Sequence, residues 1–447
     1  MINQLIQQAQ QFVKEEAWTQ ASAALQKLIL FFPNEISLQV ELAWVAEQLN
    51  DLTLAKAAYL AALKLQSSAE LWINLGRIYL QEANTAEATT AYLSAIQHTP
   101  DSALAWTHLG AAYQYSGQSQ KAEEALSKAI KLSPSPSAAE YNLGYLYLQM
   151  GAWEKGWPLL EARDWYKPFE QHFTFPKWQQ CSLEGKRLLI VPEAGHGDLI
   201  QFIRFIQQAD ALGVKQIDIL CHPALVTLFR ICFPSSNILD LSLPVPKEGW
   251  DYWVPAISLA KHFNILPDTP NLNRPYLFPI ASKQAIPHAP LKKNEKRKVG
   301  LAWRGNPLFE NDRFRSIHDF QQMKQLAELK NVTWCCLQHD VREEEKQCFH
   351  ALGLDIDYPM IHDFLDMANQ MVGLDVVVSV DTAAAHLAGA MGKQTYLMLP
   401  AYKTDWRWLL GRESTPWYQQ MHLIRQSSVG DWEGVIQVLR NKLFSIP

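Results

Sequence analysis

The strongest constraint on the fold is a motif that returns at a fixed distance through the first third of the chain. "WINLGRIY" at 72–79 is followed by "WTHLGAAY" at 106–113 and by "EYNLGYLY" at 140–147, which gives a repeat length of 34 residues. Further positions follow the same spacing: Ala88, Tyr92, Ala95 and Pro100 recur as Ala122, Leu126, Ala129 and Pro134. Small residues let two antiparallel helices approach closely, and each unit buries its apolar face only against a neighbour. We therefore predict a helical repeat array over residues 1–165.

This order of small, aromatic and proline positions resembles the tetratricopeptide repeat. Fainter units before residue 69 bring the array to about five units. The resemblance implies an α-solenoid whose concave groove binds a peptide or a protein. The alternative is a structural or dimerising stalk, and that reading leaves a homodimer possible.

The remainder of the chain alternates short β-branched runs, glycine turns and amphipathic helical patterns, as in "KRLLIVPEAGHGDLIQFIRF". Such alternation is typical of α/β folds with parallel sheets. A Pro- and Lys-rich stretch at 286–298 predicts a linker, so we expect one doubly wound half at 166–290 and a second at 291–447. Ligands of such sheets bind at the carboxyl ends of the strands.

Three loops follow predicted strands at those carboxyl ends. The first contains Gly195, His196 and Gly197, which permit a tight turn, and Asp198 at the start of a helix. A carboxylate there can accept a proton from an attacking hydroxyl. Alternatively, Asp198 only caps its helix.

The second loop, "WRGNPLFENDRFRSIH", is rich in cationic and polar side chains. These are Arg304, Asn306, Arg313, Arg315 and Ser316. Several guanidinium groups on one loop repel each other unless an anion lies between them. Salt bridges to Glu310 or Asp312 are the alternative explanation.

The third loop lies within "VVVSVDTAAAHLAGAMGK" at 376–393. The valines favour a buried strand, and the small residues from Ala383 onward favour a helix with Asp381 or Thr382 at its N-cap. A helix that begins directly after a strand presents free N–H groups and a positive dipole end, which suit a phosphate. His386 lies one turn into this helix, within reach of the same anion or facing the core.

Composition excludes several classes of protein. With 48% hydrophobic and 19% charged residues the chain is globular, and a net charge of −5 with a pI near 6.2 argues against nucleic-acid binding. Apolar runs long enough for a transmembrane segment and a signal-peptide pattern are both lacking. The six cysteines show no metal-site spacing, and we interpret them as reduced core residues of a cytoplasmic protein.

Four blocks in order after the repeats resemble one family across nearly the whole chain. They are "EAGHGDLIQFIRF", "GLAWRGNPLFENDRFRSI", "SVDTAAAHLAGAMGK" and "DWRWLLGRESTPWYQQMHLIRQ". The family comprises bacterial proteins in which tetratricopeptide repeats precede a heptosyltransferase-like glycosyltransferase domain of the GT-B fold. O-GlcNAc transferases share this architecture, and flagellin glycosyltransferases with repeats are a closer analogy.

The resemblance implies an inverting enzyme that moves a sugar from a nucleotide-sugar donor to a hydroxyl acceptor, and we expect that acceptor to be a protein held by the repeats. Asp198 matches the general base of the acceptor-side half. Asp381, Thr382 and His386 match the loop that holds the donor diphosphate, and Arg304, Arg313 and Arg315 match basic residues near the leaving nucleotide. His196 replaces the family's usual leucine and adds a titratable group beside Asp198.

No cofactor is implied, since the nucleotide sugar is a substrate, and no Asp-x-Asp pair is placed to hold a metal. Two other interpretations remain open. The acceptor could be a glycan or a lipid-linked sugar, with the repeats docking a partner. The chain could also be a repeat scaffold whose transferase half has lost activity.

Overall fold

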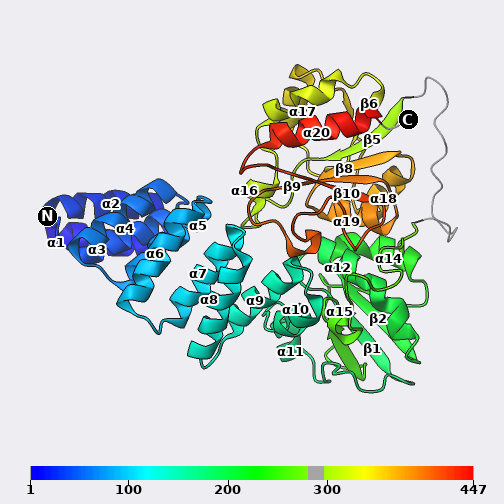
Figure 1. Cartoon of the computed structure of the whole chain (residues 1–447), viewed down its shortest axis with the longest axis horizontal. Helices are drawn as coiled ribbons and strands as arrows, with labels where there is room; N and C mark the ends of the chain where they lie inside the picture. The colour runs from blue at the N-terminus through cyan, green and yellow to red at the C-terminus, as the bar shows by residue number, and fades with distance from the viewer. Residues whose placement is uncertain (1, 280–295, 446–447) are drawn as a thin grey trace. The chain divides into compact units, whose positions relative to one another are not determined.

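The computed structural model describes residues 2–279 and 296–445 and divides the chain into two compact units, Met1–Leu146 and Tyr147–Pro447 (Figure 1). Most of the predicted linker, 286–295, lies outside the described residues, as does the predicted boundary at 290/291. The last residues assigned to the linker, Arg297 and Lys298, already belong to a strand.

The first unit is built from antiparallel helix pairs that repeat along the chain, as predicted. Its helices are α1 (Ile2–Lys14), α2 (Trp18–Phe31), α3 (Ile36–Gln48), α4 (Leu52–Leu65), α5 (Ala69–Gln81), α6 (Thr85–His98), α7 (Ala103–Tyr115) and α8 (Ser119–Leu132). Close approach within a pair depends on the repeated glycine. A methyl group added at Gly76 would lie 2.5 Å from Cε1 of Tyr92, and one at Gly110 would lie 2.5 Å from Cγ of Leu126. Only glycine leaves room for these buried side chains.

The next helices join the repeats to the α/β unit. Helix α9 (Ser137–Gln149) spans the division between the units, and α10 (Trp153–Leu160) packs inside the second one. The Trp153 ring stacks on Trp417 with centroids 4.7 Å apart, and Trp157 Nε1 donates to the Ile265 carbonyl at 2.6 Å. The division therefore lies earlier than the predicted residue 165, because α10 finds its apolar partners in the α/β unit.

The second unit contains two parallel sheets, as the strand–helix alternation predicts. The first sheet has the order β3-β2-β1-β4, and the second has the order β10-β9-β8-β5-β6-β7. The strands of the first sheet are β1 (Arg187–Val191), β2 (Gln216–Cys221), β3 (Ile238–Asp240) and β4 (Tyr252–Pro255). Those of the second are β5 (Arg297–Ala302), β6 (Val332–Cys336), β7 (Ile356–Asp357), β8 (Val376–Val380), β9 (Thr395–Leu399) and β10 (Met421–Arg425).

Helices and helical turns connect and cover these strands (Figure 1). Around the first sheet they are α11 (Lys167–His172), α12 (His196–Phe202), η1 (Ile203–Phe205), α13 (Ile206–Asp210), η2 (Pro223–Leu225), α14 (Val226–Cys232) and α15 (Ser258–His262). Around the second they are α16 (Asp312–Arg315), η3 (Phe320–Glu328), α17 (Glu343–Ala351), α18 (Phe364–Val372), α19 (Ala383–Ala390), η4 (Trp406–Trp408) and α20 (Trp432–Ser445). Val376, Val378 and Val380 of β8 form part of the core of the second sheet.

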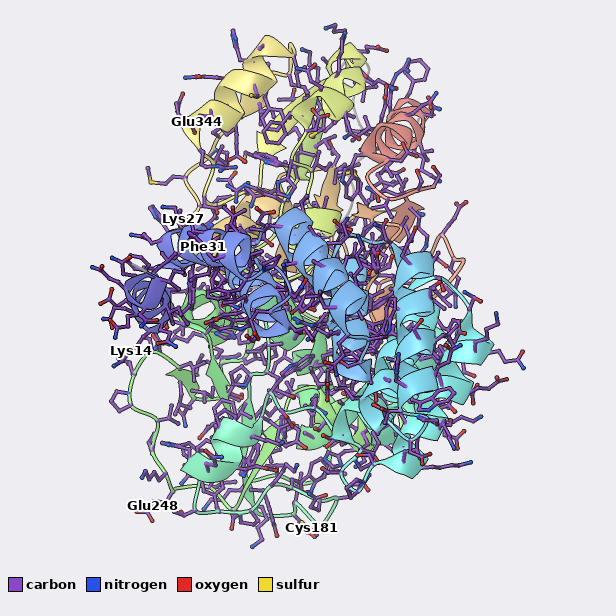
Figure 2. The ribbon with its side chains drawn as sticks, turned by 90° about the vertical axis from the view of Figure 1, so that its left-hand side faces the viewer. Lys14, Lys27, Phe31, Cys181, Glu248 and Glu344 are labelled. Atoms are coloured by element: carbon purple, nitrogen blue, oxygen red, sulfur yellow. The ribbon has the colours of Figure 1, made fainter. Side chains whose placement is uncertain are left out.

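The structure bears on the predicted burial of the cysteines and on the question of membrane-spanning helices. The prediction that all cysteines are core residues is wrong, because Cys181 and Cys348 are exposed, and Figure 2 shows Cys181 at the periphery. Cys221, Cys335 and Cys336 are buried, and all six thiols are free. Within the described ranges, every helix is too short or too polar to cross a bilayer.

Candidate functional site

Each sheet has one point where the strand order reverses, and the three predicted loops lie at these points. In the first sheet, β1 lies between β2 and β4, and the Gly195–Asp198 loop follows β1. In the second sheet, β5 and β8 are neighbours, and the arginine loop and Asp381 follow them. Loops that diverge from such neighbouring strands leave a crevice in which ligands of α/β proteins bind.

The first and third loops meet, because α12 lies directly beside α19 (Figure 1). A methyl group added at Gly197 would lie 2.7 Å from Cδ2 of His386 and 3.5 Å from Cα of Ala383. Gly197 is thus needed for close approach of the two helices and not for a turn. Left-handed backbone in this loop occurs at Ala194, with φ of 47°, whereas Gly195 has φ of −94°. The prediction that the glycines provide the turn is therefore wrong.

Asp198 lies in the first turn of α12 with its carboxylate bound on both oxygens. Oδ2 accepts a hydrogen bond from the Gly195 N–H at 2.8 Å, which is the capping contact considered as an alternative. Oδ1 accepts from Nη2 of Arg407, which belongs to the second sheet's half. Burial raises the pKa of the Asp198 carboxyl, and Arg407 and the Gly195 N–H offset this rise only in part. Asp198 is therefore a stronger base than an exposed aspartate.

Arg407 is the residue of this site that sequence reasoning missed. Its buried guanidinium also donates to both oxygens of Asp405, at 3.0 and 2.9 Å, and to Oε1 of Gln201 at 2.6 Å. It lies over the Trp406 ring, 4.6 Å from the centroid. The "DWRW" block that carries Arg407 was part of the family resemblance, but a single arginine among tryptophans gave no sign of its partner.

The start of α19 has no side-chain cap, although both candidate capping residues are present. Asp381 Oδ2 instead accepts from Trp408 Nε1 at 2.8 Å, and Thr382 Oγ1 pairs with Ser379 Oγ at 3.0 Å. Within the described residues, the N–H groups of Ala383 and Ala384 have no acceptor. Two unpaired N–H groups at the positive end of a helix dipole form an arrangement that can bind an anion.

Asp381, beside this helix start, has a raised pKa. Burial and the neighbouring Asp405 carboxylate raise the pKa of Asp381 to about 6, and Arg315, Trp408 and Arg407 offset part of the rise. The carboxyl therefore changes protonation close to neutral pH.

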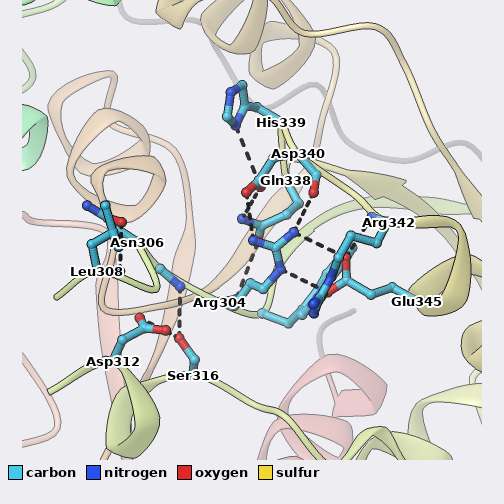
Figure 3. A network of polar contacts seen from close by, with 12 residues as sticks. Arg304, Asn306, Leu308, Asp312, Ser316, Gln338, His339, Asp340, Arg342 and Glu345 are labelled. Atoms are coloured by element: carbon cyan, nitrogen blue, oxygen red, sulfur yellow. Dashed lines mark hydrogen bonds and ion pairs between the residues drawn. The ribbon is translucent and has the colours of Figure 1, made fainter. Parts of the chain in front are cut away.

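Arg304 is used differently from the prediction, because two carboxylates already neutralise it (Figure 3). Its Nε donates to Glu345 Oε1 at 2.8 Å, and its Nη1 donates to Asp340 Oδ2 at 2.8 Å. Arg304 and Glu345 are both buried. Arg304 thus binds carboxylates of the protein itself and needs no anion to neutralise it.

The other polar residues of the loop mainly close it. Ser316 Oγ donates to Asp312 Oδ1 at 2.8 Å, and Asn306 Oδ1 accepts from the Leu308 N–H at 3.0 Å. Arg315 pairs with Asp312 at 3.1 Å, which is the alternative considered from the sequence. It also lies close enough to Asp381 to lower the pKa of that carboxyl.

The guanidinium of Arg313 lies over the Phe314 ring, 4.7 Å from the centroid. Arg315 is thus the arginine of this loop that we relate to the start of α19, through its effect on the pKa of Asp381.

His386 is buried and faces the core, as one reading of the sequence allowed. Its Nδ1 is 2.8 Å from the Tyr418 hydroxyl, and its ring stacks on Trp408. Burial lowers the pKa of His386 well below its ordinary value, and Arg407 and other nearby arginines lower it further. A neutral imidazole in this place cannot supply a positive charge to a phosphate.

His196 is also neutral near pH 7. Its ring packs between His222 and Phe364, with centroids 4.7 and 5.2 Å away. Burial, His222 and His339 lower the pKa of His196 to about 4. The residue that departs from the family pattern therefore adds an aromatic surface beside Asp198, and not a charge.

Comparison with known proteins confirms the repeats. Two family models, each described as tetratricopeptide repeat, match residues 40–106 and 103–136. Protein FlbA of Caulobacter vibrioides is 26% identical over 311 residues, which cover 64% of this chain and 51% of the relative. The chain thus spans about half the length of that curated relative. The repeats indicate peptide or protein partners.

Several solved structures resemble a part of the chain. They include the crystal structure of MamA protein, at 21% identity and a TM-score of 0.33, which covers 36% of this chain and 88% of that one. A tetratricopeptide repeat protein from Parabacteroides merdae has 18% identity and a TM-score of 0.35, covering 38% and 70%. YrrB, titled a TPR protein with an unusual peptide-binding site, has 17% identity and a TM-score of 0.31, covering 34% and 80%.

Proposed function

We propose that the α/β unit is a glycosyltransferase of GT-B type that moves a sugar from a nucleotide-sugar donor to a hydroxyl acceptor. The observation that carries this proposal is the uncapped start of α19 at the β5/β8 switch point, which lies beside the helix that bears Asp198. A diphosphate fits the two unpaired N–H groups of Ala383 and Ala384. Arg315 and Arg407 act on Asp381 beside that helix start and add positive charge there.

In the proposed reaction the acceptor oxygen attacks the anomeric carbon, and the bond from that carbon to the phosphate oxygen breaks. Asp198 takes the hydroxyl proton, and the nucleoside diphosphate leaves with the bonding electron pair. Support for this role comes from the raised pKa of Asp198 and from its partial exposure, 20% of the side chain. The contacts with Arg407 and Gly195 fix the carboxylate but use only one lone pair on each oxygen.

The repeats are proposed to hold the acceptor, which we take to be a protein because tetratricopeptide repeats indicate such partners. An acceptor on a glycan or a lipid carrier would leave the repeats as a docking module. A scaffold without catalysis would use Asp198 only for the capping contact that it also makes.

Titration of the full chain with UDP, GDP, ADP and CDP in a calorimeter tests the donor site without knowledge of the acceptor. We expect one of the four to bind, and we expect the corresponding sugar nucleotide to be slowly hydrolysed. Arg315→Met should weaken that binding by about tenfold or more, since a charge-assisted contact contributes about 1.5–3 kcal/mol. Absence of binding by all four would refute the proposal, whereas binding without hydrolysis or transfer would favour the scaffold.

A further inference from the structure

The switch point of the first sheet is closed by a side chain from the segment that connects it to the repeats. Strands β1 and β4 diverge here, so their carboxyl ends border the crevice in which a ligand would bind in a doubly wound sheet. Arg163, which follows α10, lies there with its side chain 1% exposed. The crevice of the first sheet is thus filled from within the chain.

Arg163 binds the residues that follow both strands. Its Nε and Nη2 donate to the two carboxylate oxygens of Glu193, two residues after β1, at 2.5 and 2.9 Å. Nη2 also donates to Ser258 Oγ at 2.8 Å, and Glu193 Oε1 accepts from the Ile257 N–H at 3.2 Å. Both groups follow β4. One guanidinium therefore fixes the two strand ends relative to each other.

The same guanidinium is held by its own segment. Nη1 donates to Glu161 Oε1 at 2.7 Å and to the Leu160 carbonyl at 3.1 Å, and the group lies over the Tyr166 ring, 5.0 Å from the centroid. A forked, buried contact of this kind is geometrically specific, and lysine cannot reproduce it.

A short backbone segment with one residue in the left-handed conformation connects Glu193 to Asp198. Ala194 adopts φ of 47°, and the next residue, Gly195, donates the N–H that binds Asp198 Oδ2. A shift of Glu193 therefore moves the hydrogen-bond donor of the carboxylate. Strained backbone persists only where its surroundings hold it. Here Arg163 holds Glu193, the residue before Ala194, and His222 hydrogen-bonds to the Ala194 backbone.

We propose that Arg163 is a positioning residue, which through Glu193 holds the loop that sets the place and charge state of Asp198. The inference rests on the proposed function insofar as Asp198 acts as the base. It makes the segment around Arg163 a part of the site and not a linker between domains.

The test variants are Arg163→Met, Arg163→Lys and Glu193→Gln in the full chain. The last retains the volume of Glu193 if Arg163→Met fails to fold. Lys393→Met is the matched control, because Lys393, which precedes β9, is also a buried cation but donates to the Val372 carbonyl at the end of α18. Carbon-13 NMR of protein labelled at the aspartate carboxyl carbons, with Asp198→Asn to assign the signal, follows the titration of Asp198 directly.

The charged and titratable groups that face Asp198 are Arg407 and Asp405 beside η4, His222 after β2 and His386 of α19. Each of them is unchanged in the Arg163 and Glu193 variants. Arg163→Met and Glu193→Gln remove charges of opposite sign, so their direct electrostatic effects on the pKa of Asp198 are opposite. A rise of this pKa in both variants therefore reports the weakened Gly195 N–H contact, which lowers the pKa of the carboxyl in the wild type.

We expect Arg163→Met and Glu193→Gln to raise the pKa of Asp198 and to lower turnover by about 10²-fold, as small misplacements of a catalytic group do. Binding of the nucleoside diphosphate should change less than about twofold in both variants. The pKa of Asp198 and the turnover of Arg163→Lys should lie between those of Arg163→Met and those of the wild type. Lys393→Met should leave the titration unchanged. If the wild type has no transferase activity, the titration still decides whether Arg163 positions Asp198.

An unchanged titration of Asp198 in folded Arg163→Met or Glu193→Gln protein would overturn the inference. The same holds if Lys393→Met shifts the titration equally, because the shift would then reflect general loosening of the unit.

Discussion

Replacing Arg304 by methionine should cost stability and leave nucleotide binding almost unchanged, although the sequence places Arg304 in a donor site. The reason is the pairing of its guanidinium with Glu345 and Asp340. Glu345 is buried, so removal of its cation leaves a charge without its main partner. Asp340 is 43% exposed in its side chain, so its pairing adds little.

The size of the stability loss in Arg304→Met depends on the hydrogen bonds that Glu345 keeps. It loses the Nε and Nη2 donors of Arg304, at 2.8 and 3.1 Å. It retains the Arg342 N–H at 2.8 Å, Trp303 Nε1 at 3.2 Å and Nη2 of the exposed Arg342 side chain at 3.5 Å. Breaking a buried pair from one side typically costs about 3–5 kcal/mol, and the three retained donors place this site at about 3 kcal/mol.

The stability difference between the wild type and Arg304→Met should depend on pH. Burial alone would raise the pKa of Glu345, but the contacts with Arg304, Arg342 and Trp303 hold it below its ordinary value of 4.5. A lowered pKa in the folded state contributes stability above the unfolded pKa, and this contribution is lost as the pH falls through the folded value. The gap between wild type and Arg304→Met should therefore be widest at neutral pH and should narrow below about pH 4.5.

Urea denaturation of wild type, Arg304→Met, Glu345→Gln and the double variant measures this coupling, and calorimetry with the bound nucleotide measures affinity. Arg440→Met serves as the control, since Arg440 pairs with Glu328 at the surface. A stability change for Arg304→Met below about 1 kcal/mol, or a tenfold loss of nucleotide affinity at unchanged stability, would refute the reasoning.

Asp198→Asn should lower turnover by about 10²–10⁴-fold with nucleotide affinity preserved, as single-turnover kinetics and calorimetry can show; normal turnover would place the base elsewhere. Burial raises the pKa of Asp381 to about 6, so the stability tied to its protonation is present below about pH 4 and lost as the pH rises through 6. Asp381→Asn should thus be more stable than the wild type by about 1–3 kcal/mol at pH 8, with the gap closing toward pH 4, in thermal scans at both values. Gly110→Ala should destabilise the repeats by about 1–3 kcal/mol in denaturant melts because the new methyl meets Leu126. The same substitution should cost less in a Leu126→Ala background, where the methyl meets no side chain of that size.

The sequence predicts best where periodicity and chain order decide the structure. The repeat spacing, the valine strand and the helix from Ala383 to Ala390 are all confirmed, because each depends on local pattern. The parallel sheets follow from the alternation of strands and helices. The division between units was placed too late, since nothing local in α10 reveals that Trp153 packs against Trp417, far along the chain.

The sequence could not identify the partners of the charged side chains. Arg304 follows a strand as a ligand-binding arginine would, yet its carboxylates lie beyond the next strand, at Asp340 and Glu345. Arg407 reaches Asp198 from the opposite half of the α/β unit. A long-range ion pair produces no periodic pattern in a single sequence, so these contacts can be identified only in the three-dimensional structure.

The central claim, that the start of α19 binds the donor diphosphate, is tested most directly by removing one N–H group. Ala383 is the first residue of α19, where proline fits because its missing N–H has no helical partner. Thr382 has φ of −141° and ψ of 171°, a conformation allowed before proline. Ala69→Pro at the start of α5 is the matched control, because Ser68 is similarly extended.

The measurement is calorimetric titration of full-length Ala383→Pro and Ala69→Pro with the nucleoside diphosphate that the wild type binds. The account predicts that Ala383→Pro keeps its unfolding free energy within about 1 kcal/mol and weakens binding by about tenfold or more, whereas Ala69→Pro binds like the wild type. Wild-type affinity in a folded Ala383→Pro protein would contradict the account.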